Sequence, residues 1–205
     1  QNESLMKEII SQLNELISQS DIVLKGENLE NIANKDPKSK IIAGFNALIN
    51  QAYPNLEMIS TEMAFKESDI TEIIETTQAE INMNLSEAET EILSYIQRFT
   101  SEALRISYKL LVDNFEMKPF GWSRTDIHCL TAKLFVKTKI ELRKDSAILE
   151  GRALVNALKT STLWPNVSIT LQADFSPKEL KDLKNFYENY FNKPSVSSDA
   201  RNLGK

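Results

Sequence analysis

The sequence predicts a mainly helical α+β protein. In the first 112 residues, apolar side chains recur mostly at three- and four-residue intervals, the spacing of one helix face. Apolar and polar residues alternate, as in a half-buried strand, in two short segments near the C-terminus. The expected organisation is a helical lobe over residues 1–85, a connecting helix over 86–113, a small α+β lobe over 114–192 and a linker over 193–205.

Three helices are predicted in the N-terminal lobe. The first covers about residues 3–20, because its apolar residues share one face: Leu5, Ile9, Leu13, Leu16 and Ile17. The second begins where Asp36 supplies an N-cap and Pro37 the first helical position, and it ends before Pro54. The third begins at Asp69, and its apolar residues are Ile70, Ile73, Ile74 and Ile81.

One long helix is predicted from about residue 87 to residue 112. Ser86 and Glu89 have the spacing of a capping box, which marks its start. No Gly or Pro interrupts the apolar stripe that follows: Ala88, Ile92, Ile96, Phe99, Ala103, Ile106 and Leu110. A helix of this length either forms the spine of a bundle or links two lobes.

The C-terminal lobe combines helices with two strands. Ser123 and Ser176-Pro177 mark the starts of two of its helices, and apolar residues at alternate positions mark its strands. The predicted elements, in order, are a helix that begins at Ser123, a strand over 139–143, a turn at Asp145-Ser146, a short helix around 154–158, a strand over 167–172 and a last helix that begins at Ser176-Pro177.

Charge divides the chain into two unlike halves. Residues 1–115 hold 19 Asp and Glu against 9 Lys and Arg, whereas residues 116–205 hold 10 against 15. The basic half favours an anionic partner, and the acidic half is typical of a spacer or a protein-binding surface. Five basic residues fall near a helix end and on the next strand, where a winged-helix module would meet DNA phosphates: Lys133, Lys137, Lys139, Arg143 and Lys144.

Two observations count against that interpretation of the basic residues. Positive charge at a helix C-terminus also complements the helix dipole. A winged-helix domain normally has two tightly spaced helices before its wing, and the sequence shows only one clearly. A winged-helix-like lobe therefore remains the prediction, with DNA contact left open.

The aromatic residues Phe120 and Trp122 flank a glycine in the segment Lys118-Pro119-Phe120-Gly121-Trp122. Gly121 allows a turn that fixes both rings. The two rings could offer a platform to a base or a partner chain. Alternatively, they form a hydrophobic plug that seats the next helix on the core. Both residues are therefore candidate structural or partner anchors.

Catalytic machinery is not expected in this segment. It contains no Gly-x-x-x-x-Gly-Lys-Ser/Thr loop and no glycine-rich phosphate cradle. His128 and Cys129 are neighbours, and adjacent helical residues point about 100 degrees apart, so they form a poor nucleophile and base pair. With one cysteine and one histidine, neither a disulfide nor a structural zinc site is expected. The prediction is no enzyme, no catalytic residue, no metal and no cofactor bound here.

The segment is expected to be cytoplasmic. No apolar run approaches the roughly 18 to 20 residues that span a bilayer, and no signal peptide pattern is present. The chain opens on Gln1 and closes on residues with no helix stop, so it is expected to be a piece of a larger protein.

Several short motifs follow one another in a specific order and spacing between about residues 45 and 192. They are Ala52-Tyr53-Pro54-Asn55-Leu56, Lys118-Pro119-Phe120-Gly121-Trp122, Asp126-Ile127, Leu134-Phe135 and Lys139-Ile140-Glu141-Leu142. With these motifs the chain resembles a C-terminal piece of the large P-loop ATPase of BREX bacteriophage-resistance systems. The resemblance implies a bacterial host, an upstream core that binds ATP and magnesium, and a multiprotein defence complex that works on or near DNA. It assigns no functional residue to this region.

The expected function is that of a non-catalytic interaction module of a BREX ATPase, which mediates protein assembly, with DNA contact open. Other BREX components, DNA and a second copy of the chain are the partners considered, and no membrane is expected. One alternative is a direct DNA-binding winged-helix module, favoured if the basic residues of 118–184 cluster on one face. The other is a purely structural or oligomerisation segment, favoured if the acidic stripe pairs with a basic patch elsewhere.

Overall fold

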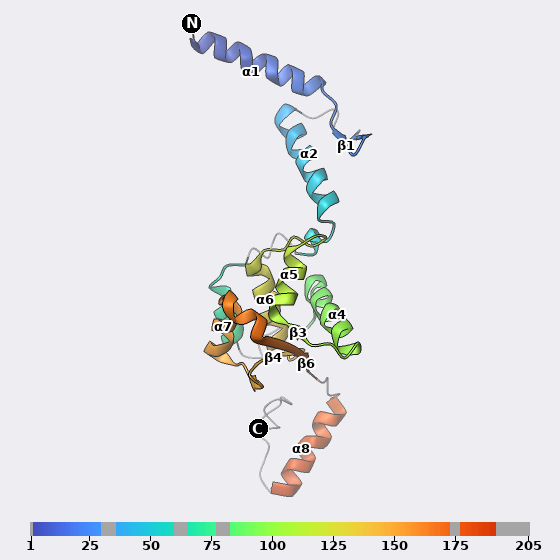
Figure 1. The fold of residues 1–205 in the computed structure, drawn as a ribbon, viewed down its shortest axis with the longest axis vertical. Coiled ribbons are helices and arrows are strands. Elements are labelled where there is room, and N and C mark those ends of the chain that lie inside the picture. Colours follow the sequence, from blue (N-terminus) through green and yellow to red (C-terminus); the bar gives the residue numbers. More distant parts are fainter. Residues whose placement is uncertain (1, 30–35, 60–64, 77–82, 173–176, 192–205) are drawn as a thin grey trace. The chain divides into compact units, whose positions relative to one another are not determined.

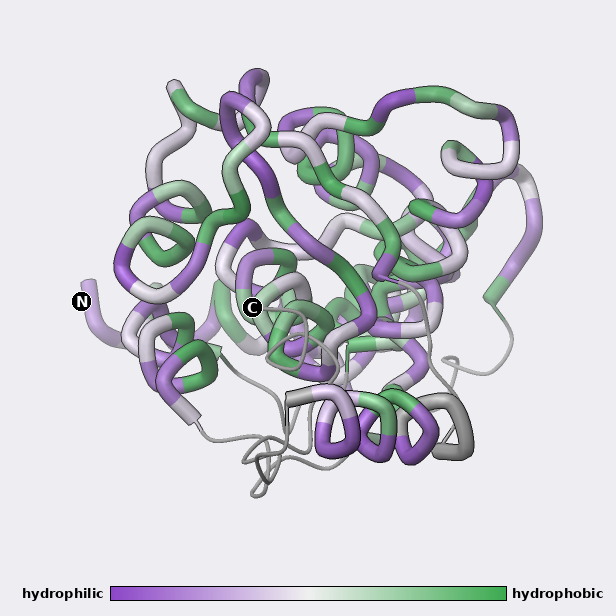
Figure 2. The backbone as a smooth tube through the Cα atoms, turned by 90° about the horizontal axis from the view of Figure 1, so that it is seen from below, coloured by the Kyte–Doolittle hydropathy of each residue, from purple (hydrophilic) through white to green (hydrophobic). Residues whose placement is uncertain are grey.

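The computed structural model describes residues 2–29, 36–59, 65–76, 83–172 and 177–191 (Figure 1). The chain divides into two compact units. Unit 1 comprises residues 1–57 with 117–121, and unit 2 comprises residues 58–116 and 122–205. Hydrophobic and hydrophilic residues alternate around the helices (Figure 2). Three predicted features lie outside the described residues, namely Ile81, Ser176 and the linker over 193–205.

Unit 1 contains two helices and a small hairpin. The predicted helices are confirmed as α1 (Asn2–Gln19) and α2 (Pro37–Ala52), and the antiparallel strands β1 (Val23–Leu24) and β2 (Glu27–Asn28) lie between them in the chain. The Asp36 side chain accepts a hydrogen bond from the Ser39 amide at 3.2 Å, as an N-cap does. The buried Lys40 ammonium donates to the carbonyl oxygens of Ser18 and Ser20 and so caps the C-terminus of α1.

Unit 2 contains the remaining elements and a four-stranded antiparallel sheet with strand order β3-β6-β4-β5. The 3-10 helix η2 (Leu56–Met58) ends at Met58, which is the first residue of unit 2. The elements that follow are α3 (Asp69–Glu75), α4 (Glu87–Ser101), β3 (Ile106–Ser107), α5 (Tyr108–Glu116), α6 (Arg124–Val136), β4 (Ile140–Lys144), β5 (Ala147–Ile148), α7 (Gly151–Lys159), the 3-10 helix η4 (Ser161–Asn166), β6 (Val167–Leu171) and α8 (Pro177–Phe191).

The predicted single helix over residues 87–112 is wrong, because α4 ends at Ser101. Ala103 adopts a left-handed conformation with φ of 56°, and the Leu104 amide donates to the Phe99 carbonyl at 2.9 Å. This is the hydrogen-bond pattern of a Schellman motif, which closes a helix. That position is usually glycine, so an alanine there gives the sequence no stop signal.

The chain then contributes a strand and a second helix where the single helix was predicted. Ile106 in β3 pairs with Ile169 in β6, more than 60 residues later in the chain. The Ser107 hydroxyl accepts a hydrogen bond from the Leu110 amide at 3.2 Å and so caps the start of α5. Pairing with a distant strand therefore replaces helix continuation at this point.

The other predicted elements of unit 2 are confirmed with small shifts of their bounds. Ser86 and Glu89 form the predicted capping box, and Ser123 caps α6 through the Asp126 amide at 3.2 Å. The strands β4 and β6, the turn at Asp145-Ser146 and the helices α7 and α8 lie where the sequence predicts them. The mainly helical class with short strands is thus confirmed.

The core of unit 2 lies between the sheet and the helices α4, α5 and α6 (Figure 1). One face of the sheet supplies buried apolar side chains to this core: Ile140, Leu142, Val167 and Ile169. The other face carries a row of polar residues across three strands, in which Ser107 pairs with Ser168 and Ser168 with Arg143. An antiparallel sheet can pack one face on the core and carry polar residues on the other.

Candidate interaction surfaces

Trp122 lies in the core of unit 2 with only 2% of its surface exposed. Its ring stacks on that of Phe115, with centroids 4.7 Å apart and planes at 13°. The Trp122 amide also donates to the Phe115 carbonyl at 2.9 Å. A buried, stacked indole cannot offer its face to a base, so this geometry favours the structural plug over the platform.

Gly121 lies where only a glycine fits. Its φ is 67°, and a Cβ at this position would lie 2.5 Å from Cδ1 of Tyr53 at the end of α2. The Asn55 amide donates to the Pro119 carbonyl at 3.2 Å, and Phe120 is buried. The loop over 117–121 is therefore packed against the segment that follows α2, and it presents no open aromatic pair.

The five basic residues singled out from the sequence have unlike surroundings. Lys133 Nζ lies 4.5 Å from the centroid of the Phe65 ring, a cation–π contact. Arg143 forms an ion pair with Glu141 on its own strand at 2.8 Å. Lys139 and Lys144 are half-buried, and Lys137 is buried. The five therefore do not form one exposed cluster, because Lys137 points into the protein.

Lys137 and Glu89 form a buried ion pair. Lys137 Nζ lies 2.8 Å from Oε1 and 2.7 Å from Oε2 of Glu89, and it donates to the Asn84 carbonyl at 2.7 Å. The two side chains are 6% and 2% exposed. Glu89 also accepts from the Ser86 amide at 2.7 Å in the capping box. The pair thus joins the start of α4 to the end of α6.

Helix α6 is buried on nearly all sides. Nine of its 13 residues are buried, and both α3 and α4 pack against it. The Cys129 sulfur lies 3.9 Å from the Lys66 carbonyl oxygen, in the segment just before α3. In a helix-turn-helix protein the second helix enters the major groove with its side chains exposed. In this conformation α6 has no exposed face of that kind.

The only histidine of the chain lies in a buried aromatic cluster. His128 Nδ1 is 2.5 Å from the Tyr108 hydroxyl, and the His128 ring meets the edge of Trp164 at 5.4 Å. Burial, together with the nearby positive charges of Arg124 and Lys159, lowers the pKa of His128 to about 4. Burial also raises the pKa of the Cys129 thiol to about 12. At neutral pH the imidazole is unprotonated and the thiol keeps its proton, so neither is activated.

We expect unit 2 to lose stability as the pH falls from about 6.5 to about 4. The unfolded chain binds a proton at His128 below about pH 6.5, whereas the folded protein resists it until about pH 4. The loss should reach about 3 kcal/mol, since each pKa unit corresponds to about 1.4 kcal/mol. Denaturant melts at several pH values test this.

A matched variant and a direct titration separate His128 from the carboxylates that titrate in the same range. His128→Asn keeps a hydrogen-bonding partner for Tyr108 and should remove this part of the pH dependence. The NMR signals of the only histidine report its pKa without ambiguity. A measured pKa near 6.5 in the folded protein would contradict the prediction.

Within the described residues, no group of three or more His, Cys, Asp or Glu side chains could hold a metal ion. None of the described helices combines the length and the apolar content that a membrane span requires.

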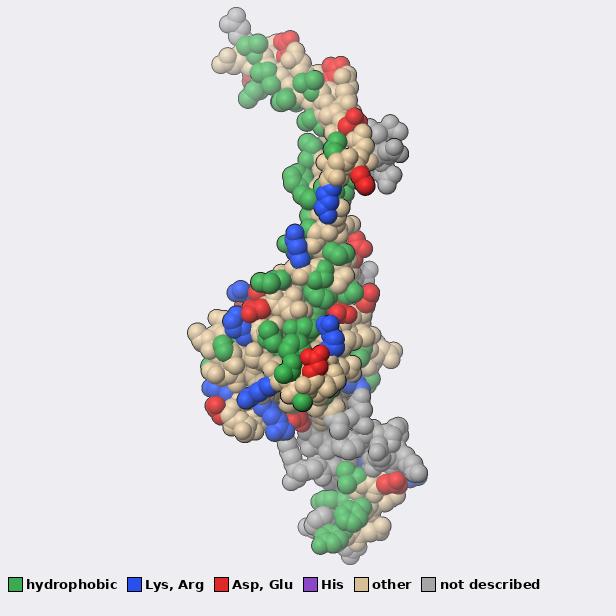
Figure 3. Space-filling view, turned by 45° about the vertical axis from the view of Figure 1, so that its right-hand side comes forward, with side chains coloured by type: hydrophobic (Ala, Val, Ile, Leu, Met, Phe, Trp, Pro, Cys, Tyr) green, Lys and Arg blue, Asp and Glu red, His purple; other side chains and the backbone are tan. Residues whose placement is uncertain are grey.

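The helices of unit 1 expose most of their apolar residues (Figure 3). No residue of α1 is buried, and six of its large apolar side chains are at least 50% exposed: Leu5, Met6, Ile9, Ile10, Leu13 and Leu16. Helix α2 exposes five more, namely Ile41, Ile42, Phe45, Leu48 and Ile49. We call these two sets the apolar stripes. Exposed apolar residues on a protein surface are normally scattered singly, whereas each of these stripes groups five or six of them on one helix.

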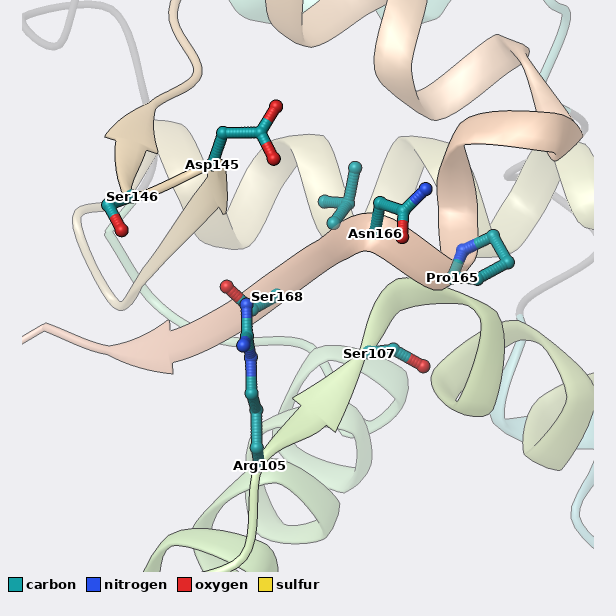
Figure 4. Close-up of a pocket in the computed structure, with 8 residues that line it drawn as sticks. Arg105, Ser107, Asp145, Ser146, Pro165, Asn166 and Ser168 are labelled. Atoms are coloured by element: carbon teal, nitrogen blue, oxygen red, sulfur yellow. The ribbon is translucent and has the colours of Figure 1, made fainter.

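A polar depression of about 440 Å³ lies at one end of the sheet of unit 2 (Figure 4). It is formed by the start of β3, the start of β6 and the turn between β4 and β5. Its lining residues are Arg105, Ser107, Asp145, Ser146, Pro165, Asn166, Val167 and Ser168. None of them was singled out as a site residue from the sequence, because only strand pairing brings them together.

The topology defines a winged helix-turn-helix protein. Helices α5 and α6 form the helix-turn-helix pair, α4 supports it, and β3, β6 and β4 form the small sheet. The connection between β4 and β6 is enlarged by β5, α7 and η4.

The model of one protein family, the BREX ATP-binding protein BrxC winged helix-turn-helix domain, matches residues 55–171. The chain belongs to this family, which confirms the resemblance seen in the sequence. The matched domain is a winged helix domain and not a catalytic one. No solved structure matches the chain significantly.

Proposed function

We propose that this chain is a non-catalytic assembly module of a BREX ATPase, and that two copies of it associate through the apolar stripes of α1 and α2. The exposure of these stripes carries the proposal. Seven large apolar side chains on one 18-residue helix, with none buried, are not accounted for by the fold of unit 1. Apolar surface left in contact with water has a free-energy cost of about 25 cal/mol per Å², relative to the same surface buried.

The sequence of α1 supports pairing with a second copy. Met6, Ile9, Leu13 and Leu16 have the three- and four-residue spacing of a coiled-coil seam. The positions that flank such a seam carry almost no charge here: Leu5, Ile10, Gln12, Ile17 and Gln19. Two identical helices can therefore pair along this seam without bringing many like charges together.

Helix α2 supplies a second stripe of the same kind. Ile41, Phe45, Leu48 and Ala52 continue the coiled-coil spacing, and the first three are exposed. Two copies would thus bring four amphipathic helices together, the number that a four-helix bundle uses to bury its core. The BREX family also implies other system components as partners, for which the same stripes are the expected surface.

Replacing apolar residues in the α1 seam should abolish this association. We expect Ile9→Glu with Leu13→Glu to convert a dimer into a monomer, because the charges would be buried in the seam without partners. Light scattering coupled to size exclusion, at several concentrations of the full chain, measures the oligomeric state. The thermal melt of the unit 2 core should stay unchanged.

The matched control is Ser4→Glu with Ser11→Glu, which adds the same charge to the opposite face of the same helix. This control should still form dimers. Monomeric wild type at the highest soluble concentration, or equal disruption by both double variants, would contradict the proposal.

A further inference from the structure

The polar depression of unit 2 contains the cationic side chain of Arg105. Arg105 is exposed and forms no ion pair with any described residue. Its side chain extends from the start of β3, and it lines the depression together with Ser168 of β6 (Figure 4). A guanidinium presents several donors in one plane and matches a phosphate group with two parallel hydrogen bonds.

The remaining lining groups donate and accept hydrogen bonds. Asp145 supplies a carboxylate and Asn166 an amide, and both residues line the depression (Figure 4). Three serines add hydroxyl groups, namely Ser107, Ser146 and Ser168. Little apolar surface is present, since only Pro165 and the buried Val167 contribute it. An apolar ligand would strip water from the Arg105 guanidinium and the Asp145 carboxylate and offer them no hydrogen bond, which disfavours it.

The turn at the rim holds an unfavourable backbone conformation. Asp145 and Ser146 both have positive φ, 49° and 69°, in a two-residue connection between Lys144 and Ala147. Such turns usually contain glycine, because left-handed conformations cost other residues about 1 kcal/mol or more. These two residues therefore place a carboxylate and a hydroxyl beside the depression, where glycine would supply neither.

We infer that this depression binds a nucleotide, either free or as one unit of a single-stranded nucleic acid. Its phosphate would lie on Arg105, and its sugar hydroxyls or base amino groups would donate to Asp145 and Asn166. The inference is independent of the proposed association through α1 and α2.

A single strand fits this surface better than a duplex does. A winged-helix protein reads duplex DNA with its second helix in the major groove, and α6 is buried here. In a single strand the sugar and base edges are open to hydrogen bonding outside a groove. The depression offers that bonding without an exposed recognition helix.

Binding of the full chain to three probes tests the inference. The probes are adenosine monophosphate, a mixed-sequence single-stranded oligonucleotide and the matching duplex, measured by calorimetry or fluorescence anisotropy. Binding of the monophosphate supports a free nucleotide, and binding of the strand alone supports a nucleic acid unit. We expect Arg105→Gln to weaken binding at least tenfold. For the single-stranded oligonucleotide, the same variant should also reduce the steepness of log binding constant against log salt concentration by about 0.7, the value for one phosphate contact.

The control variant is Arg152→Gln on α7, which makes the same change at an exposed arginine outside the depression. Arg152→Gln should bind the probes like wild type, and the two variants should melt at the same temperature. The inference is overturned if neither nucleotide probe binds at low salt, or if Arg152→Gln weakens binding as much as Arg105→Gln. Tighter binding of the duplex, of inorganic phosphate or of a phosphopeptide would also overturn it.

Discussion

Lys137→Met should lower the free energy of unfolding of unit 2 by about 3–5 kcal/mol, the cost of removing one partner from a buried ion pair. The substitution leaves the Glu89 carboxylate in the interior without its cation, at 2% exposure. It also removes the donor to the Asn84 carbonyl. Both losses act at the junction between α4 and α6. Denaturant melts of the single variant measure the effect.

Two further variants separate the ion pair from packing. In Lys137→Met with Glu89→Gln, the buried charge is gone and the Gln side chain still reaches the Ser86 amide, so a large part of the stability should return. Lys109→Met breaks an exposed pair with Asp113, whose side chains are 52% and 42% exposed, and should cost less than about 1 kcal/mol. A loss of that small size in Lys137→Met would show that the ammonium is solvated and not paired.

Trp122→Ala should also cost about 3–5 kcal/mol, as truncations of large buried aromatic side chains do. The indole is 2% exposed and stacks on Phe115, so its removal leaves a cavity between the end of α5 and the start of α6. Denaturant melts measure the loss, and the slope of the transition should stay unchanged because the same surface unfolds.

The control for Trp122 is Phe45→Ala on α2, where the ring is 61% exposed. Measured at a concentration at which the chain is monomeric, it should change stability by less than about 0.5 kcal/mol. If Trp122→Ala costs less than about 1 kcal/mol but abolishes binding to a partner or to DNA, the aromatic platform is the correct interpretation.

These expectations share one structural cause. The helix-turn-helix pair of this domain contributes its second helix to the core, through the buried side chains of α6 and the Lys137 ion pair. A helix that is buried on nearly all sides serves packing. The surfaces that we propose for partners therefore lie elsewhere, on the apolar stripes of unit 1 and in the polar depression of unit 2.

Local signals were enough to predict most elements. Asp36, Ser86 and Ser123 each marked a helix start correctly, because a capping side chain bonds to a backbone amide within three residues. The strands β4 and β6 were also predicted, since alternation of apolar and polar residues is visible within five residues. The membership in the BREX family was recognised from the order of short motifs.

The sequence by itself therefore determined the class of the fold, the helix starts, the two main strands and the family. Only the tertiary structure decided where α4 ends, that Lys137 is paired in the interior and that Arg105 lies in a depression with Asn166. Each of these depends on residues far apart in the chain. Glu89 is 48 positions from Lys137, and β3 pairs with a strand more than 60 residues away. A periodic pattern records which face of an element is apolar, but not which distant residue will lie against it.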